Sequence, residues 1–323
     1  MPEESLESMP ADTIVISGPT ASGKTEVAVQ VSELVNGEIV NADSMQVYRG
    51  MDIGTAKPNQ DERSRASFHL IDVASPSDPY TVSLWREQAS KAIRDITARG
   101  KVPVICGGTG FYIRSLLRNP ALAETGRSDE IRAELGILAE AEGKQAVYNR
   151  LQQVDPITAT RLHPNDVLRV IRAMEVYLVT GTPLSEHHRL DRDNTSRTAE
   201  FRGLQFVLNR DRLELSERIE RRVDSMMMAG LIDEVRDLLA AGYAQTLAPM
   251  NSLGYKEVCS YLANSITAEQ AVREIKFNTR RYAKRQLTWF RAEPEAHWID
   301  VSTISLDAAA NRISREWHAF HHR

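Results

Sequence analysis

The sequence of 323 residues predicts an α/β protein in which a parallel sheet is flanked by helices. Short apolar, β-branched runs alternate with helical patterns in the first third of the chain, a glycine-rich loop joins the first run to a helix, and helical patterns alone fill the middle. We expect residues 13–115 and 200–323 to form one discontinuous core and residues 116–199 to form an inserted all-helical domain. Residues 1–12 are acidic and polar, and we expect them to be disordered.

The first half of the core contains four expected strands. Residues 13–17 (TIVIS) lead through GPTASGKT into the helical pattern TEVAVQVSELV. The runs EIVNAD, FHLIDV and VPVICGG follow, and helical or loop segments separate them. Strands that alternate with helices in this way are typical of a parallel sheet.

Helical spacing dominates the insertion, in SDEIRAELGILAEAE, KQAVYNRLQQV and NDVLRVIRAMEVYLVTG. We expect the last of these helices to begin at a cap formed by Asn165 and to end at Gly181. The strand-like run FRGLQFVLN, near Phe201, predicts the return to the core, and a helical pattern follows it up to Gly242. The remainder is predicted to be helical apart from a short strand in AHWIDV.

The composition is that of an ordinary globular protein, with 42% apolar and 26% charged residues and a net charge of -4. Two cysteines, Cys106 and Cys259, are too few for a disulfide framework or a zinc ligand set. The chain lacks a secretory signal and any run of about 18 apolar residues, so we expect a cytoplasmic protein that does not associate with membranes. It shows no self-complementary apolar stripe, which favours a monomer.

The glycine-rich loop matches the pattern G-x-x-x-x-G-K-[ST] and stands between an expected strand and an expected helix, as a P-loop does. Its backbone amides can surround phosphate oxygens, Lys24 adds a positive charge, and the Thr25 hydroxyl can bind Mg²⁺. Together with the alternating strands, the motif predicts a P-loop NTPase-like core that binds a di- or triphosphate. The predicted diphosphate-binding residues are Gly18, Pro19, Thr20, Ala21, Ser22, Gly23, Lys24 and Thr25.

The P-loop alone leaves the reaction open. An ATPase or a nucleotide kinase would bind ATP there, and Asp43 at the end of EIVNAD could position the metal ion in such an enzyme. The same carboxylate could instead act as a base. A non-catalytic RNA-binding protein is a third alternative, although it has no need for a phosphate cradle that faces a carboxylate.

Residues 42–58, ADSMQVYRGMDIGTAKP, closely resemble the signature of the tRNA dimethylallyltransferase family (tRNA isopentenyltransferases). Further similar segments follow in the expected order: GGTGFY, HPNDVLRVIRAMEVY, ERIERRV, NSLGYKE and RRYAKRQLTWFR. The resemblance implies transfer of a dimethylallyl group from dimethylallyl diphosphate to N6 of adenosine 37 in the anticodon loop of tRNA, with release of diphosphate. Phe68-His69 departs from the family's frequent His-His pair, and the absence of a C-terminal zinc finger is typical of a bacterial member.

The resemblance also implies roles for Thr109 and Arg218, and the chemistry of the implied reaction assigns one to Asp43. Asp43 would accept the proton of the adenine amine, and with an ordinary pKa it would be ionised at pH 7. Thr109, in a glycine-rich turn, would orient the amine or the diphosphate, and Arg218 would reach the diphosphate. The structural alternatives are a strand-end cap for Asp43, a turn residue for Thr109 and a surface charge for Arg218.

The adenine must leave its stacked loop to reach a buried diphosphate, so the protein needs a surface that holds RNA. Arg273, Lys276, Arg280 and Lys284 recur along one side of an expected helix and could follow the phosphate backbone, or could be a solvated face. The aromatic residues Tyr282, Trp289 and Phe290 could stack on bases or pack in the core. The tRNA contacts that the resemblance implies are Asp43, Ser44, Met45, Gln46, Leu168, Arg169, Val170, Ile171, Arg172, Gly254, Tyr255, Lys256, Arg280, Arg281, Lys284, Arg285 and Gln286.

Overall fold

The computed structural model describes residues 11–118, 126, 128–193 and 200–321. The chain divides into two compact units, one formed by Met1–Leu117 with Glu200–Arg323 and the other by Arg118–Ala199. In the described part of the chain, no helix is both long and apolar enough to cross a membrane.

The first unit contains a six-stranded sheet whose strands are all parallel, in the order β3-β2-β4-β1-β5-β6. This confirms the predicted fold class. β2 ends before Asp43, which therefore lies in the loop that follows the strand. The strands are β1 (Ala11–Ser17), β2 (Gly37–Asn41), β3 (Phe68–His69), β4 (Val102–Gly107), β5 (Phe201–Asn209) and β6 (His297–Asp300).

The first strand starts two residues earlier than expected, because β1 extends its pairing with β5 to Ala11 opposite Phe201. At the next position Arg202 donates a hydrogen bond from Nε to Oδ1 of Asp12 at 2.6 Å. The prediction that the whole of 1–12 is disordered is therefore wrong for residues 11 and 12, and residues 1–10 lie outside the described residues. Strand pairing with a partner about 190 residues away is invisible in the local pattern.

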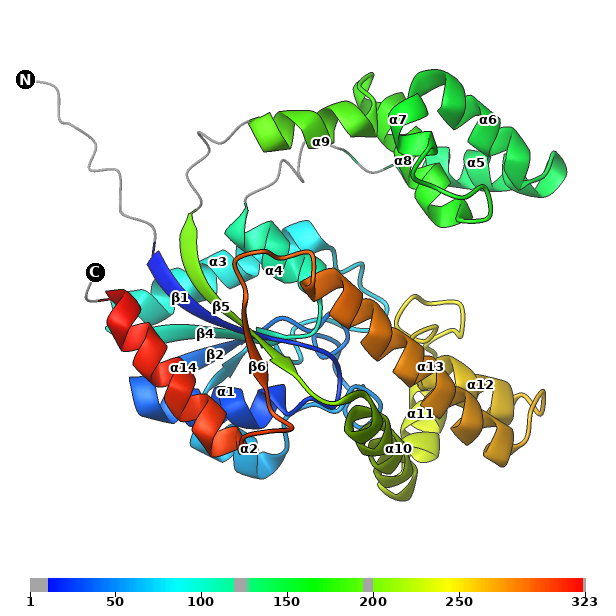
Figure 1. Cartoon of the computed structure of the whole chain (residues 1–323). Helices are drawn as coiled ribbons and strands as arrows, with labels where there is room; N and C mark the ends of the chain where they lie inside the picture. The colour runs from blue at the N-terminus through cyan, green and yellow to red at the C-terminus, as the bar shows by residue number, and fades with distance from the viewer. Residues whose placement is uncertain (1–10, 119–125, 127, 194–199, 322–323) are drawn as a thin grey trace, which may run out of the picture. The chain divides into compact units, whose positions relative to one another are not determined.

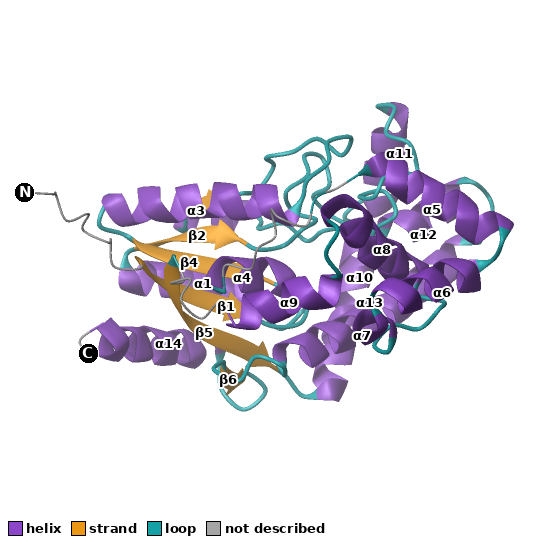
Figure 2. Ribbon diagram, turned by 90° about the horizontal axis from the view of Figure 1, so that it is seen from above, coloured by secondary structure: helices purple, strands orange, loops and turns teal. Residues whose placement is uncertain are grey.

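Helices cover both faces of the sheet (Figures 1 and 2). On one face, α1 (Lys24–Val35) and α14 (Leu306–His321) pack on Ile14, Ile16 and Phe206. On the other face, α3 (Val82–Ala98) and α4 (Gly110–Leu117) pack on Val15 and Val207. Alternate residues of β1 thus enter opposite apolar layers, as a doubly covered parallel sheet requires.

A group of four helices lies beyond the carboxyl ends of the strands (Figure 1). The helical pattern expected up to Gly242 breaks in two at Gly230, which adopts φ 97°, a left-handed conformation that glycine tolerates. A short helix, α2 (Gln60–Arg65), follows β2 in the sheet region. The four helices of the group are α10 (Arg212–Met228), α11 (Leu231–Ala240), α12 (Tyr255–Leu262) and α13 (Ala268–Phe290).

The second unit is a helical bundle with its own core, which includes Leu135, Val147, Leu151 and Met174. Val170 and Ile171 are buried in the same core, so their side chains are packing residues and the predicted tRNA contact through them is corrected. The helices are α5 (Asp129–Ala141), α6 (Lys144–Val154), α7 (Pro156–Ala159), α8 (Val167–Thr180) and α9 (Leu184–Asp193).

The two ends of α8 compare differently with the sequence prediction. The helix ends at Gly181 with φ 71°, as predicted. The Asn165 cap is wrong: Asp166 occupies the capping position without a side-chain hydrogen bond, and the Asn165 amide instead donates to Nδ1 of His163 at 3.1 Å.

Glu175 on α8 is fully buried and anchors the second unit. Its carboxylate accepts hydrogen bonds from Arg132 Nε at 2.9 Å, from Arg172 Nη1 at 2.7 Å and from the Ser128 amide at 2.9 Å. We expect Glu175→Ala to lower the free energy of unfolding by about 2–3 kcal/mol, because the three donors lose a charged acceptor that is fully buried. Chemical denaturation monitored by circular dichroism tests this, with Glu142→Ala on the exposed end of α5 as the control; equal stability of the two variants would contradict it.

Candidate active site

The P-loop follows β1 near the middle of the sheet, and close packing forces its conformation. Gly18 adopts φ 142°, and a Cβ atom there would lie 2.4 Å from the carbonyl oxygen of Leu208 on β5. Any side chain would therefore push the loop off the sheet. The Oγ of Ser22 is buried within this loop and has no hydrogen-bond partner. A glycine-rich loop before a helix N-terminus, with an unpaired hydroxyl, is suited to an anion.

Lys24 begins α1 and lines the cavity above the loop. Its Nζ donates to the carbonyl oxygen of Pro19 at 2.6 Å, so the ammonium bends back over the P-loop. Burial lowers the pKa of Lys24 to about 8, and the nearby Arg222 guanidinium acts in the same direction. An anionic ligand would offset this burial by supplying the charge that the site lacks.

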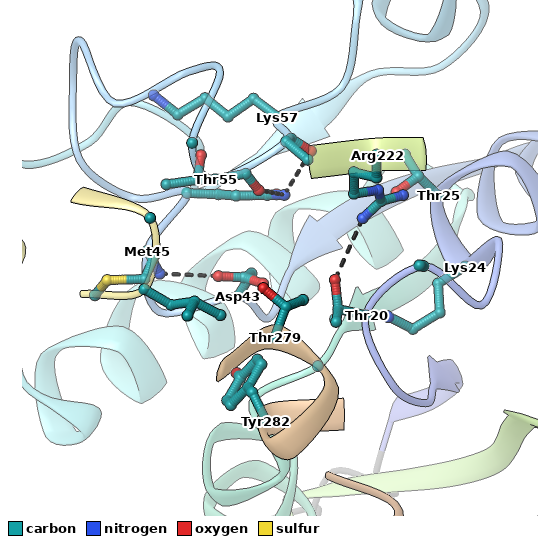
Figure 3. A pocket seen from close by; sticks show the side chains of 18 of the residues that line it. Thr20, Lys24, Thr25, Asp43, Met45, Thr55, Lys57, Arg222, Thr279 and Tyr282 are labelled. Carbon is teal, nitrogen blue, oxygen red and sulfur yellow. Dashed lines mark hydrogen bonds between the residues drawn. The ribbon is translucent and has the colours of Figure 1, made fainter. Parts of the chain in front are cut away.

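Asp43 lies at the carboxyl end of β2, across the cavity from the P-loop (Figure 3). Its Oδ1 accepts the Met45 amide at 2.9 Å, and its own amide donates to Oδ1 of Asn41 at 3.2 Å. Burial raises the pKa of Asp43 above the ordinary value, which corrects the sequence-based expectation of an unshifted carboxylate. A raised pKa makes the carboxylate a stronger proton acceptor.

Thr109 supports this carboxylate indirectly. Its Oγ1 accepts the Ser44 amide at 3.0 Å and donates to the Ser44 Oγ at 3.3 Å. Beside it, Gly107 would place a Cβ atom 2.1 Å from the carbonyl oxygen of Ala42, so only glycine allows β4 to approach the turn this closely. Thr109 thus fixes the turn that carries Asp43, and its predicted role toward substrate stays a prediction.

Two arginines of α10 reach the P-loop. Arg218 Nε donates to the carbonyl oxygen of Ala21 at 3.0 Å, and Arg222 Nη1 donates to Oγ1 of Thr20 at 3.3 Å. Both side chains line the cavity. The sequence prediction included Arg218 and missed Arg222, although the spacing of four residues in ERIERRV already places both on one helix face.

Helix α13 joins the P-loop to the end of β4. Gln286 Oε1 accepts the Thr20 amide at 2.8 Å, and its Nε2 donates to the carbonyl oxygen of Gly108 at 2.9 Å. Both ends of the Gln286 side-chain amide are engaged within the protein, and its predicted contact with tRNA stays a prediction. Thr279 and Tyr282 of the same helix also line the cavity; the sequence prediction missed Thr279 and named Tyr282 only as a residue that could stack on bases or pack in the core. Burial raises the pKa of Tyr282, which stays a neutral phenol.

These elements enclose a cavity of about 840 Å³. Figure 3 shows Thr20, Lys24 and Arg222 on one side of it, with Asp43 and Met45 on the other. The volume is ample for a prenyl diphosphate together with a nucleobase. The structure brings the following predicted residues to this cavity: Thr20, Ala21, Gly23, Lys24, Thr25, Asp43, Ser44, Met45, Gln46, Arg218, Gly254, Lys256, Arg281, Arg285 and Gln286.

Several predicted tRNA contacts have other partners. Arg280 pairs with Glu220 at 2.6 Å and Lys276 with Asp224 at 2.7 Å. Two of the four basic residues predicted along one side of α13 are therefore paired with carboxylates of α10. Arg273 and Lys284 are exposed and still suit a phosphate track. The Tyr255 ring is fully buried, which corrects its predicted contact with tRNA.

The predicted contacts on α8 lie in the second unit. The Leu168 side chain is 83% exposed, and Arg169 is exposed while pairing with Asp166 at 3.2 Å. Arg172 donates to Glu175 and to the carbonyl oxygen of Gly126 at 2.7 Å, so it holds the bundle together. Of this segment, the side chains of Leu168 and Arg169 are exposed, and their contact with tRNA stays a prediction.

The cavity fits a Mg²⁺ ion that arrives with a diphosphate. Among the described residues, no group of three or more His, Cys, Asp or Glu side chains could hold a metal ion by itself. Thr25 lines the cavity directly after Lys24, and one hydroxyl with phosphate oxygens is the usual ligand set of Mg²⁺ at a P-loop. The Thr25 hydroxyl would be the protein's ligand in the P-loop, which suits a metal that the substrate itself largely coordinates.

The fold and the site define the class of protein: an α/β protein with a P-loop NTPase-like fold, whose glycine-rich loop and Asp43 line one cavity. The IPP transferase family model matches residues 46–293, and the isopentenyl transferase model matches residues 11–72. The chain belongs to the IPP transferase family, which confirms the resemblance seen in the motifs.

Individual relatives are similar along most of the chain. The tRNA dimethylallyltransferase of Geobacter metallireducens is 49% identical over 290 residues, which cover 89% of this chain and 92% of that protein. The tRNA dimethylallyltransferase of Pelotomaculum thermopropionicum is 45% identical over 312 residues, covering 96% and 98%.

Solved structures agree with the sequence relatives. The full-length tRNA isopentenylpyrophosphate transferase of Bacillus halodurans matches with a TM-score of 0.69 and 35% identity, covering 98% of this chain and 100% of that one. A eukaryotic dimethylallyltransferase acting on tRNA matches with a TM-score of 0.79 and 27% identity, covering 97% and 80%.

Proposed function

We propose that this protein transfers a dimethylallyl group from dimethylallyl diphosphate to N6 of adenosine 37 in the anticodon loop of tRNA. The observation that carries the proposal is the cavity in which the P-loop faces the Asp43 carboxylate. A donor diphosphate at the P-loop leaves the rest of the cavity for the prenyl chain and the adenine. Family membership favours this reaction over the kinase, ATPase and RNA-binding alternatives.

The first task of the site is to stabilise the leaving diphosphate. The bond between the allylic carbon and oxygen breaks readily because the positive charge spreads over the allyl group, while negative charge grows on the diphosphate. The P-loop amides, Lys24, Arg218 and Arg222 converge on the place where this charge develops. A Mg²⁺ ion bound to Thr25 and the diphosphate oxygens would add positive charge there.

The second task is to remove a proton from the adenine amine. The nitrogen lone pair is delocalised into the purine ring, so N6 becomes a useful nucleophile only if its proton leaves as the new C–N bond forms. Asp43, with its raised pKa, is placed to accept this proton. The products are N6-dimethylallyladenosine in tRNA and diphosphate. Asp43 then releases the accepted proton to solvent and becomes a carboxylate again.

The direct test is incubation of the purified protein with dimethylallyl diphosphate, Mg²⁺ and unmodified tRNA, followed by mass analysis of the nucleosides. We expect adenosine to gain one five-carbon prenyl group. Parallel reactions with ATP and without the prenyl donor test the competing function: ATP consumption with no modified adenosine would reject the proposal. The cytoplasmic location and the monomeric state stay predictions from the sequence.

The shifted pKa values predict a bell-shaped dependence of kcat/KM on pH. As the pH falls through the raised pKa of Asp43, the carboxylate becomes protonated and cannot accept the amine proton. As the pH rises through about 8, Lys24 in the free enzyme loses its charge and binds the donor less tightly. Initial rates at subsaturating dimethylallyl diphosphate, measured from acid to alkaline pH across both pKa values, check both limbs. Persistence of the alkaline limb in Lys24→Met would show that another group causes it.

A further inference from the structure

One wall of the cavity is a tight loop that leads from the Asp43 turn to α2. Gly54, Thr55, Ala56 and Lys57 line the cavity from this loop. The loop contains no regular secondary structure, and Ala56 adopts a positive φ of 51°. Such a loop needs tertiary contacts to keep one conformation.

Glu234 on α11 supplies three of those contacts, and Lys57 adds others to the Tyr48 carbonyl oxygen and to Asp72. The Glu234 carboxylate accepts the backbone amides of Asp52 at 2.9 Å, Ile53 at 2.7 Å and Gly54 at 3.1 Å. Three successive amides that converge on one carboxylate fix the direction of the loop backbone. The carboxylate comes from about 180 residues further along the chain.

Tyr255 on α12 completes this arrangement. Its hydroxyl donates to Glu234 Oε1 at 2.7 Å. Its ring packs against Gly54 so closely that a Cβ atom there would lie 2.5 Å from the ring carbon Cε2. The buried ring and the carboxylate thus hold the same point of the loop from two helices.

The loop is also bonded to the turn that carries the proposed base. Gln46 Nε2 donates to the carbonyl oxygens of Thr55 and Ala56, each at 3.1 Å. Gln46 lies three residues after Asp43, whose Oδ1 accepts the Met45 amide within the same turn. The P-loop, in contrast, is held by Gln286, Arg218 and Arg222. Glu234 therefore holds the acceptor side of the cavity, while Gln286, which also donates to Gly108 beside Thr109, links the P-loop to the end of β4.

We propose that Glu234, assisted by Tyr255, is a positioning residue that sets the acceptor side of the cavity. It touches no reacting atom and acts through the loop at residues 52–57 and through Gln46 on the Asp43 turn. The inference rests on the proposed function. Its consequence is a split effect: loss of the Glu234 carboxylate impairs use of tRNA and leaves donor binding intact.

The test compares Glu234→Gln with Asp233→Asn, the same chemical change at the neighbouring residue, whose carboxylate is 71% exposed and pairs with Arg236. The amide introduced by Glu234→Gln would turn an N–H group toward backbone donors that need an acceptor. We expect kcat/KM for an unmodified anticodon stem-loop to fall about ten- to a hundredfold in Glu234→Gln. We expect the dissociation constant for inorganic diphosphate with Mg²⁺ to stay at the wild-type value, and Asp233→Asn to match wild type in both measurements.

Hydrogen exchange provides a readout of the mechanism. The amides of Asp52, Ile53 and Gly54 should exchange faster in Glu234→Gln, with the P-loop amides unchanged. If Glu234→Gln does not fold, Tyr255→Phe replaces it, since that change removes one hydrogen bond and keeps the ring. We then expect kcat/KM for the stem-loop to fall severalfold and diphosphate binding to stay unchanged.

The outcomes separate the two proposals. If wild type and Asp233→Asn modify adenosine and the Glu234 and Tyr255 variants do so with the same kcat/KM, the positioning role is overturned. Equal losses in diphosphate binding and in stem-loop use would also overturn it, because they indicate a general structural defect. If wild type itself forms no prenylated adenosine, the proposed function fails.

Discussion

Asp43→Asn is expected to lower kcat by about 10²- to 10⁴-fold, the usual range for removal of a general base. The asparagine has the same shape, and its Oδ1 can still accept the Met45 amide that Asp43 accepts now. The turn and the cavity should therefore persist, while the proton of the adenine amine has no acceptor. Single-turnover prenylation measured by nucleoside mass analysis gives the rate, and fluorescence anisotropy of a labelled stem-loop gives the tRNA affinity.

Asp95→Asn is a matched control for this experiment, since Asp95 on α3 is 63% exposed and pairs with Arg99. The control should react at the wild-type rate. A wild-type rate in Asp43→Asn would instead show that this carboxylate has only a structural role, as a strand-end residue, and that water or another group accepts the proton.

Lys24→Met should lower kcat by about 10²- to 10³-fold and raise the KM for dimethylallyl diphosphate, because it removes the charge that neutralises the leaving diphosphate. Loss of one preorganised donor in an active site usually lowers kcat by this amount. Steady-state kinetics with varied donor at saturating tRNA tests both parameters. Lys91→Met, at an exposed position on α3, is the control. Unchanged kinetics in Lys24→Met would show that the P-loop takes no part in the reaction.

The same variant makes a prediction about stability. Burial lowers the pKa of Lys24 to about 8 in the folded protein, below the 10.5 of an unperturbed lysine, so the charged form destabilises the fold wherever it is populated. At pH 7 the ammonium is charged in both the folded and the unfolded state. Lys24→Met should therefore keep or raise the thermal midpoint at pH 7 while it abolishes most of the activity, which separates a catalytic defect from unfolding.

The local pattern of the chain was sufficient for the sheet and for the P-loop. Strand runs such as TIVIS and VPVICGG alternate with helices, and the GPTASGKT loop falls where a strand meets a helix. Boundaries were less accurate: Asn165 does not cap α8, and one predicted helical segment became α10 and α11. The choice of cap depends on which backbone conformation the preceding loop adopts, and that conformation is set by packing.

The sequence by itself determined the fold class and the place of the glycine-rich loop, because these depend on residues within a few positions of one another, while the proposal of Asp43 as the base also needed the reaction that the family resemblance implies. Only the tertiary structure decided which distant side chains complete the site. Gln286 meets Thr20 across 266 residues, and Glu234 meets the loop at 52–54 from about 180 residues away. The physical reason is that a hydrogen bond or an ion pair depends on atomic distances of about 3 Å, and chain folding brings such atoms together without leaving a periodic signal in the sequence.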